Sequence, residues 1–141
     1  MSLEDSNKAI MQRFIETWNQ GDMEGLESFW ASNIVHYTRA GHGKQDILRS
    51  YGITMRAFPD LQWEIGDIIA QGDKVVLRLT GRATHTGPFL EILPTGKRVE
   101  FRSVDICRLA DGKIVEHWGL LDELALLEQL DLIPSEYLTA M

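Results

Sequence analysis

The apolar residues of the chain change their spacing near its middle. In the first half they recur at three- and four-residue intervals, which is typical of amphipathic helices. Asp22 is placed to cap the second of these helices, and Pro59 ends the third. A short extended segment over residues 34–38 separates the second helix from the third. We therefore expect three helices, with apolar stripes over residues 10–18, 23–30 and 47–58.

From residue 61 onward apolar and polar residues alternate, which is typical of half-buried strands. Gly72-Asp73 and Asp111-Gly112 predict turns between strands, residues 86–97 read as a loop, and a last helix is expected to begin near Asp122. Three helices followed by long strands predict an α+β domain with helices on one face of a strongly curved, mostly antiparallel sheet. Such a sheet closed by helices encloses a cavity. No repeat or linker divides residues 1–141, so we expect a single domain.

Composition and charge narrow the classes of partner. The 141 residues carry a net charge of −7, and an acidic surface repels phosphate, so we do not expect nucleic-acid binding. The N-terminus lacks a signal-peptide pattern and no apolar run is long enough to cross a membrane, so we expect a cytoplasmic protein without a membrane partner. Cys107, the only cysteine, is predicted to be a free, buried thiol.

The last hairpin places two carboxylates on the apolar face of the sheet. If Asp111-Gly112 is a two-residue turn, Asp105 faces Trp118 and Phe101 faces Asp122 across the hairpin. All four side chains then point into the cavity. Loss of water raises the pKa of a carboxyl group toward the range useful for proton transfer.

Three alternatives remain open for these residues. Asp122 is also a favourable N-cap for the last helix. Asp105 could instead be satisfied by the backbone or by Arg108. A three-residue turn with a bulge would shift the register by one residue and place His117 opposite Asp105.

A third candidate for chemistry is His85, which shares the apolar face of Val75, Leu77 and Leu79. It is read either as a catalytic group or as a satisfied core residue. The sequence has no His and acid pair at metal-ligand spacing, no glycine-rich phosphate loop and no nucleophile elbow. We therefore expect neither a metal nor a cofactor.

Several short motifs spread over nearly the whole chain resemble one family. They are Phe58-Pro59-Asp60-Leu61, Gly72-Asp73-Lys74-Val75-Val76, Thr84-His85-Thr86-Gly87-Pro88-Phe89, Pro94-Thr95-Gly96, Val104-Asp105-Ile106 with Arg108, Asp111 to Trp118, Asp122, and Leu127-Glu128-Gln129-Leu130. Together they resemble the SnoaL-like polyketide (ester) cyclases.

The resemblance implies the cone-shaped nuclear-transport-factor-2-like fold, which is shared with ketosteroid isomerases, scytalone dehydratases and limonene epoxide hydrolases. It implies that Asp122 is the general acid/base of an intramolecular aldol condensation that uses no cofactor. It also implies that a group near Trp18 shapes the pocket, and that Asp105 matches a protonated oxyanion-hole residue of the isomerases.

Our leading hypothesis is a cofactor-independent acid/base enzyme, a cyclase or an isomerase, acting on a small apolar or polyketide-like carbonyl compound. Asp122 would move the proton, and Asp105 or His85 would donate a hydrogen bond to the enolate oxygen. The alternatives are a non-catalytic small-molecule binder and an epoxide-hydrolase-like enzyme, which would need an Asp-Arg-Asp cluster. The residues expected to hold the ligand are Trp18, His36, Tyr37, Tyr51, Met55, Phe58 and Trp118.

We also expect a homodimer. The convex face of a curved sheet usually packs against a second copy, and Val104 and Ile106 point to that face in the predicted register.

Overall fold

The computed structural model describes residues 1–39, 41–134 and 136, and this part of the chain contains four helices and five strands. Three helices precede the long strands, as the change in apolar spacing predicted. None of the helices in this part of the chain is long and apolar enough to cross a membrane. The elements in chain order are α1 (Leu3–Asn19), α2 (Met23–Glu27), β1 (Trp30–Tyr37), α3 (Lys44–Ala57), β2 (Gln62–Gln71), β3 (Lys74–Thr84), β4 (Arg98–Ala110), β5 (Lys113–Leu121) and α4 (Glu123–Gln129).

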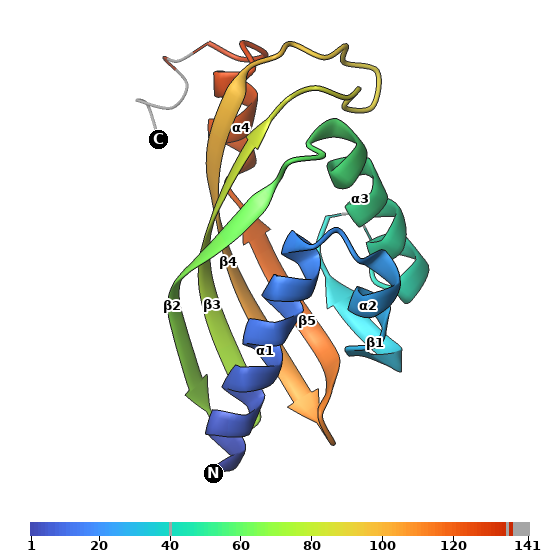
Figure 1. Cartoon of the computed structure of the whole chain (residues 1–141), viewed down its shortest axis with the longest axis vertical. Coiled ribbons are helices and arrows are strands. Elements are labelled where there is room, and N and C mark those ends of the chain that lie inside the picture. Colours follow the sequence, from blue (N-terminus) through green and yellow to red (C-terminus); the bar gives the residue numbers. More distant parts are fainter. Residues whose placement is uncertain (40, 135, 137–141) are drawn as a thin grey trace.

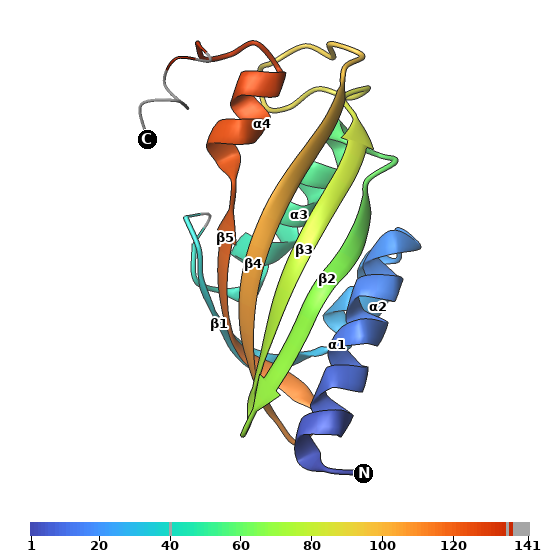
Figure 2. The ribbon, with the colours of Figure 1, turned by 90° about the vertical axis from the view of Figure 1, so that its left-hand side faces the viewer.

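The five strands form one curled, unclosed sheet in the order β1-β5-β4-β3-β2. β1 pairs parallel with β5, whereas the other neighbours pair antiparallel. Helices α1 and α3 lie on the inner side of the curl, and α4 follows β5 at one end of the sheet (Figure 1). Figure 2, turned by 90°, shows the long strands β2 to β4 crossing the molecule with α3 behind them. The α+β prediction with helices on one side of a curved sheet is confirmed.

The apolar stripe of α1 holds this helix against β2 and β3. Ser2 caps the helix by accepting a hydrogen bond from the Asp5 N–H at 3.0 Å. The stripe consists of Met11, Phe14, Ile15 and Trp18, all of them buried. Each large apolar side chain removed from water stabilises the fold by about 1.5 to 3 kcal/mol, so the stripe alone fixes which side of α1 faces the sheet.

The third helix begins and ends where local chemistry requires. The Gly43 N–H donates to the Asp46 carboxylate at 3.0 Å, which satisfies one backbone donor at the start of α3. The helix ends at Ala57, two residues before Pro59. There the Gly87 N–H donates to the Ala57 carbonyl at 3.1 Å. A side chain at position 87 would overlap the Arg56 carbonyl oxygen, so only glycine permits this close approach.

The register of the β4–β5 hairpin differs from both registers considered from sequence. The two-residue turn is confirmed, since Ala110 pairs with Lys113 and Leu109 with Ile114. Beyond that point the register shifts by one residue, and Val115 is the extra residue of the bulge.

The shift reverses the faces of the residues that follow. Asp105 pairs with Gly119, so the predictions that Trp118 or His117 lies directly opposite it are both wrong. His117 now turns to the inner face of the sheet, which carries Asp105, and Trp118 turns to the outer face.

β1 adds a second pair of residues at the same level of the sheet. In the parallel pairing of β1 with β5, His36 lies beside His117 and Tyr37 lies beside Trp118. Because neighbouring side chains on one level of a sheet share a face, His36 points inward and Tyr37 points outward. Two histidines far apart in sequence therefore meet on the inner face.

Candidate active site

A cavity of about 650 Å³ lies between the inner face of the curled sheet and helices α1 and α3. Its wall is mostly apolar, and the polar side chains in the wall come chiefly from β1, β4, β5 and α3. Cavities of this size accept drug-sized molecules, with a few polar groups fixing their orientation. The apolar wall includes Met11, Phe14, Ile15, Trp18, Trp30, Phe58, Trp63, Leu77, Leu79, Phe89, Phe101, Cys107, Ile114 and Leu126.

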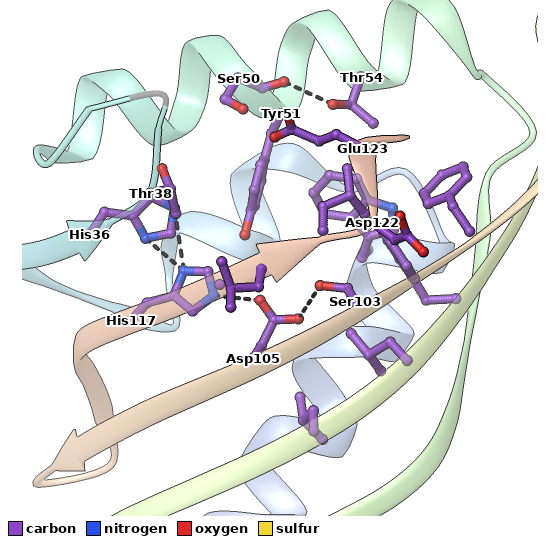
Figure 3. A pocket seen from close by; sticks show the side chains of 18 of the residues that line it. His36, Thr38, Ser50, Tyr51, Thr54, Ser103, Asp105, His117, Asp122 and Glu123 are labelled. Carbon is purple, nitrogen blue, oxygen red and sulfur yellow. Dashed lines mark hydrogen bonds and ion pairs between the residues drawn. The ribbon is translucent and has the colours of Figure 1, made fainter. Parts of the chain in front are cut away.

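Four polar side chains in this wall form one hydrogen-bonded series, which we call the polar chain. Ser103 Oγ donates to Asp105 Oδ2 at 2.8 Å, and His117 Nε2 lies 2.7 Å from Asp105 Oδ1. His117 Nδ1 lies 2.6 Å from His36 Nδ1. Figure 3 shows the series running along the floor of the cavity from Ser103 to His36.

The hydrogen positions in the polar chain follow from its acceptors. An ionised carboxylate only accepts, so His117 presents Nε2–H to Asp105. In a neutral imidazole the other nitrogen, Nδ1, is then an acceptor, and it accepts a hydrogen bond from the Nδ1–H of His36. Both oxygens of Asp105 are thus held by donors, and the carboxylate is fixed in position.

The second histidine of the chain is held neutral. Burial, followed by the neighbouring His117, lowers the pKa of His36 to about 3, and the Asp46 carboxylate offsets part of this shift. Its side chain is only 4% exposed. A neutral His36 can donate its Nδ1–H to His117 without placing a positive charge beside it.

Gly119 makes room for the contact between Asp105 and His117. A Cβ atom at position 119 would lie 2.7 Å from Asp105 Oδ1 and 3.0 Å from His117 Nε2. The first distance is too short for a carbon atom and the second is tight, so a side chain there must displace the Asp105 carboxylate. Because the residue opposite Asp105 has no side chain, His117 reaches it diagonally across the strands.

Asp122 lies at the open side of the cavity and is exposed. Its Oδ1 accepts from the Ala125 N–H at 3.1 Å and caps α4, so the capping role considered from sequence is confirmed. The prediction that Asp122 is a carboxylate desolvated inside the cavity is wrong, because the β5 bulge and the start of α4 leave it at the rim. On the same rim Arg39 and Glu123 form an ion pair at 3.2 Å.

Three of the predicted ligand-binding side chains line the cavity with aromatic surface. Trp18 and Tyr51 pack edge to face at 4.4 Å between ring centroids, and both line the wall together with Phe58. Burial, followed by the negative charge of Asp105, raises the pKa of the Tyr51 phenol. Met55 does not line this cavity and faces a smaller hollow that also borders Trp18 and Phe58.

His85 is fully buried but does not line the cavity. Its Nδ1 accepts from the Thr95 N–H at 3.2 Å, and burial lowers the pKa of the imidazole. Nε2 has no hydrogen-bond partner among the described residues. The side chain packs against Phe58 and fastens the loop that carries Thr95, so the core-residue interpretation fits its surroundings better than catalysis does.

Tyr37 and Trp118, predicted to hold the ligand, stack on each other outside the cavity. Their ring centroids lie 5.1 Å apart with an interplanar angle of 12°. Tyr37 donates to Glu116 Oε2 at 2.9 Å, and Arg108 binds the other oxygen of the same carboxylate. Arg108 thus lies on the face opposite Asp105, which leaves no Asp-Arg-Asp cluster around this carboxylate.

Ser103 and His117 belong to the site, although the sequence did not single out Ser103 and placed His117 near Asp105 only in the alternative register with a bulge. Ser103 lies two residues before Asp105 on a strand, so the two-residue period could have indicated it. His117 carried no comparable signal, because its face depends on the bulge at Val115. The buried Cys107, predicted as a free thiol, is confirmed as one. Over residues 1–39, 41–134 and 136, no group of three or more His, Cys, Asp or Glu side chains is arranged to hold a metal ion.

Comparison with known proteins identifies the family to which a chain with this fold and cavity is similar. Residues 8–130 match the model of the SnoaL-like polyketide cyclases. No curated protein matches the chain.

Solved structures with similar folds extend the comparison. AclR, a proposed hydroxylase from Streptomyces galilaeus, is 37% identical with a TM-score of 0.88, over 93% of this chain and 99% of that one. IdmH, a proposed polyketide cyclase from Streptomyces antibioticus, is 30% identical with a TM-score of 0.78, over 89% of this chain and 98% of that one. A proposed polyketide cyclase from Bacillus cereus is also 30% identical, with a TM-score of 0.76, over 89% of this chain and 80% of that one. The chain therefore belongs to the SnoaL-like polyketide cyclase family, within the nuclear-transport-factor-2-like superfamily.

Proposed function

We propose that the chain is an acid/base enzyme that removes a proton from the carbon beside a carbonyl group of a small, apolar, polyketide-like compound. The reaction would be an aldol-type cyclisation carried out without a metal or a nucleotide. The polar chain is the observation that carries this proposal, because it presents a carboxylate fixed by two donors at the wall of an apolar cavity.

In this proposal Asp105 is the base. One of its oxygens accepts the proton of the carbon acid as the C–H bond breaks, and the electron pair moves onto the carbonyl oxygen to form an enolate. The enolate carbon then attacks a second carbonyl group of the same molecule. The resulting alkoxide takes the proton back from Asp105, so the carboxylate is regenerated and no other reactant is consumed.

His117 and Ser103 would act as positioning residues for this step. Their hydrogen bonds at 2.7 and 2.8 Å hold the carboxylate in one orientation, which removes the cost of ordering it in the transition state. His36 keeps the imidazole of His117 in the tautomer that faces Asp105.

The family resemblance assigns the proton transfer to Asp122 instead, and this assignment competes with ours. Asp122 borders the cavity, but its carboxylate is exposed and one oxygen already caps α4. The Asp105 side chain, in contrast, is only 16% exposed, lies in the cavity wall and has both oxygens held by donors, which favours it as the base.

Proton exchange tests the proposal without knowledge of the natural substrate. A panel of aromatic β-diketones is incubated in deuterium oxide with the wild-type protein, and deuterium entry at the carbon between the carbonyls is followed by NMR. We expect exchange above the buffer rate in the wild type and a loss on the order of a hundredfold or more in Asp105→Asn. Asp122→Asn is the matched control, because asparagine keeps the cap and removes the charge.

The outcomes separate the assignments. Loss of exchange in Asp105→Asn alone supports the proposal. Loss in Asp122→Asn alone moves the base to the cavity rim and contradicts the role of Asp105. Absence of exchange in the wild type with every diketone contradicts the acid/base proposal and favours a non-catalytic binding protein.

A hydroxylase is the second candidate function, favoured by the 37% identity to AclR. An enolate formed at Asp105 is also able to react with molecular oxygen, which would form a carbon–oxygen bond and, with the proton returned by Asp105, a hydroperoxide; a two-electron reductant such as a thiol would then convert the hydroperoxide into the alcohol and water. Oxygen consumption during turnover of an exchanging diketone would indicate this reaction, whereas cyclisation consumes none.

A further inference from the structure

Tyr51 presents an uncommitted hydrogen-bond donor to the cavity. Its side chain descends from α3, and Figure 3 shows its hydroxyl end directed toward Asp105 and His117. Tyr51 lines the cavity wall. Among the residues that the structure describes, none forms a hydrogen bond with its hydroxyl group. A phenol in an apolar wall without a partner is available to a bound molecule.

The surroundings of Tyr51 keep the phenol both protonated and in place. Its ring is wedged between Trp18 at 4.4 Å and Trp30 at 5.7 Å between centroids, with His36 beyond it at 6.5 Å. Burial and the negative charge of Asp105 raise the pKa of the hydroxyl group, so it stays a donor through the physiological range.

Two other hydroxyl groups of the cavity wall already donate hydrogen bonds within the protein. Ser103 donates to Asp105 at 2.8 Å, and Thr54 donates to the Ser50 carbonyl at 3.1 Å. His85 does not reach the cavity wall at all.

From this arrangement we infer that the Tyr51 hydroxyl donates the hydrogen bond that stabilises the oxyanion of the reacting substrate. The inference deepens the proposed function and rests on it for the identity of the base. As Asp105 takes the carbon proton, negative charge moves to the carbonyl oxygen. Tyr51 keeps its own proton and shares it with that oxygen in a hydrogen bond. The sequence had assigned this role to Asp105 or His85.

The geometry also names the class of substrate that this donor fits. The carbonyl oxygen must lie on the α3 side of the cavity while the acidic carbon lies on the β4 side, above Asp105. An aryl ketone or aryl β-diketone satisfies both conditions, with its ring against Trp18 and Trp30.

Ionisation of a bound naphthol tests the donor independently of turnover. A naphtholate carries its charge on an oxygen attached to an aromatic ring, as the enolate of an aryl ketone does. In Asp105→Asn the carboxylate is neutralised, so the naphtholate is not repelled. A series of substituted naphthols of graded acidity is bound to this variant, and the ionised fraction is read from the absorbance of the naphtholate. The same series is then bound to Asp105→Asn/Tyr51→Phe and to Asp105→Asn/Tyr37→Phe.

We expect Tyr51→Phe to raise the apparent pKa of the bound naphthol by about 1 to 2 units, because it removes a hydrogen bond to a charged oxygen. Tyr37→Phe removes a matched hydroxyl group on the outer face, and we expect no shift. In the wild-type background Tyr51→Phe should slow deuterium exchange on the order of a hundredfold.

The inference and the proposed function fail in different ways. An unchanged naphthol pKa in the Tyr51→Phe variant overturns the donor role even if Asp105→Asn abolishes exchange. A shifted pKa together with full exchange in Asp105→Asn leaves the donor in place and contradicts the base. A series of naphthols that does not bind the cavity also counts against the inference, since a free donor in an aromatic wall should bind them.

Discussion

The imidazole of His117 lies 2.7 Å from the Asp105 carboxylate although the two residues do not pair across their strands. Asp105 pairs with Gly119 and His117 pairs with Cys107, so the contact is diagonal. It exists because the bulge at Val115 turns His117 inward and because Gly119 leaves its place empty. A one-residue insertion in β5 therefore creates the polar chain.

Replacement of Gly119 tests this relationship. Gly119→Ala puts a methyl group 2.7 Å from Asp105 Oδ1 and forces the carboxylate and the imidazole apart. We expect diketone exchange to fall at least tenfold, while far-ultraviolet circular dichroism stays that of the wild type. Gly52→Ala is the matched control, because a methyl group there meets open space on α3. Gly72→Ala is unsuitable, because a φ of +59° strains any residue with a side chain. Wild-type exchange in Gly119→Ala would show that the diagonal contact is dispensable.

Because Asp122 caps α4, we expect alanine and asparagine at this position to change the free energy of unfolding by different amounts. Asp122→Ala removes the acceptor for the Ala125 N–H and should lower the free energy of unfolding by about 1 kcal/mol. Asp122→Asn keeps an acceptor and should change it by less than about 0.5 kcal/mol. Urea denaturation measures both. Equal destabilisation by alanine and asparagine would mean that the charge, and not the cap, stabilises this end of α4.

Buried His36 predicts a loss of stability at low pH. Its pKa is about 3 in the folded protein and about 6.5 in an unfolded chain, so the unfolded state binds the proton first as the pH falls. The free energy of unfolding should therefore decrease from about pH 6.5 downward, by at most about 1.4 kcal/mol per pH unit from this residue. The groups facing His36 are His117, Asp46 and Tyr51.

Substitution isolates this contribution. His36→Gln should show a smaller difference in the free energy of unfolding between pH 7.5 and pH 5 than the wild type, measured by urea denaturation. His42→Gln, in which an exposed histidine is removed, should keep the wild-type difference. An undiminished pH dependence in His36→Gln would contradict the role of His36. The buried His85, whose pKa is also lowered, contributes in the same direction in all three proteins.

The sequence predicted the elements of the fold because their signals are local. Apolar spacing located the helices, and the two-residue period placed Phe101 and Asp105 on the inner face, where they lie. The bulge at Val115 has no such signal, since a β-branched residue fits a regular strand equally well. The residues of β5 after the bulge were therefore assigned to the wrong face of the sheet. Trp118 was predicted to point into the cavity, but His117 does so instead.

The parallel pairing of β1 with β5 could not be predicted from local sequence patterns, for a different reason. Parallel neighbours are joined through distant chain segments, and no turn fixes their register. The contact of His36 with His117 and the outward position of Tyr37 both depend on that register. Tyr51, in contrast, was found from the helical stripe alone, because the inner side of a helix is set by its own period.

We propose that the protein forms a homodimer through the outer face of its sheet. Val104 is 46% exposed there, beside Ile106 and the Tyr37–Trp118 stack. We expect a dimer in sedimentation velocity, and we expect Val104→Glu to dissociate it by placing a charge in an apolar contact. Leu90→Glu, which changes an exposed residue of the loop after β3, should leave the dimer intact. A monomeric wild-type protein would contradict the proposal.

The most direct measurement of the central claim is a crystal structure with a β-diketone that exchanges but cannot cyclise. The account predicts that the acidic carbon lies about 3 to 3.5 Å from a carboxylate oxygen of Asp105, with its carbonyl oxygen turned toward Tyr51. A diketone whose acidic carbon approaches Asp122, or that binds outside the cavity, would contradict it.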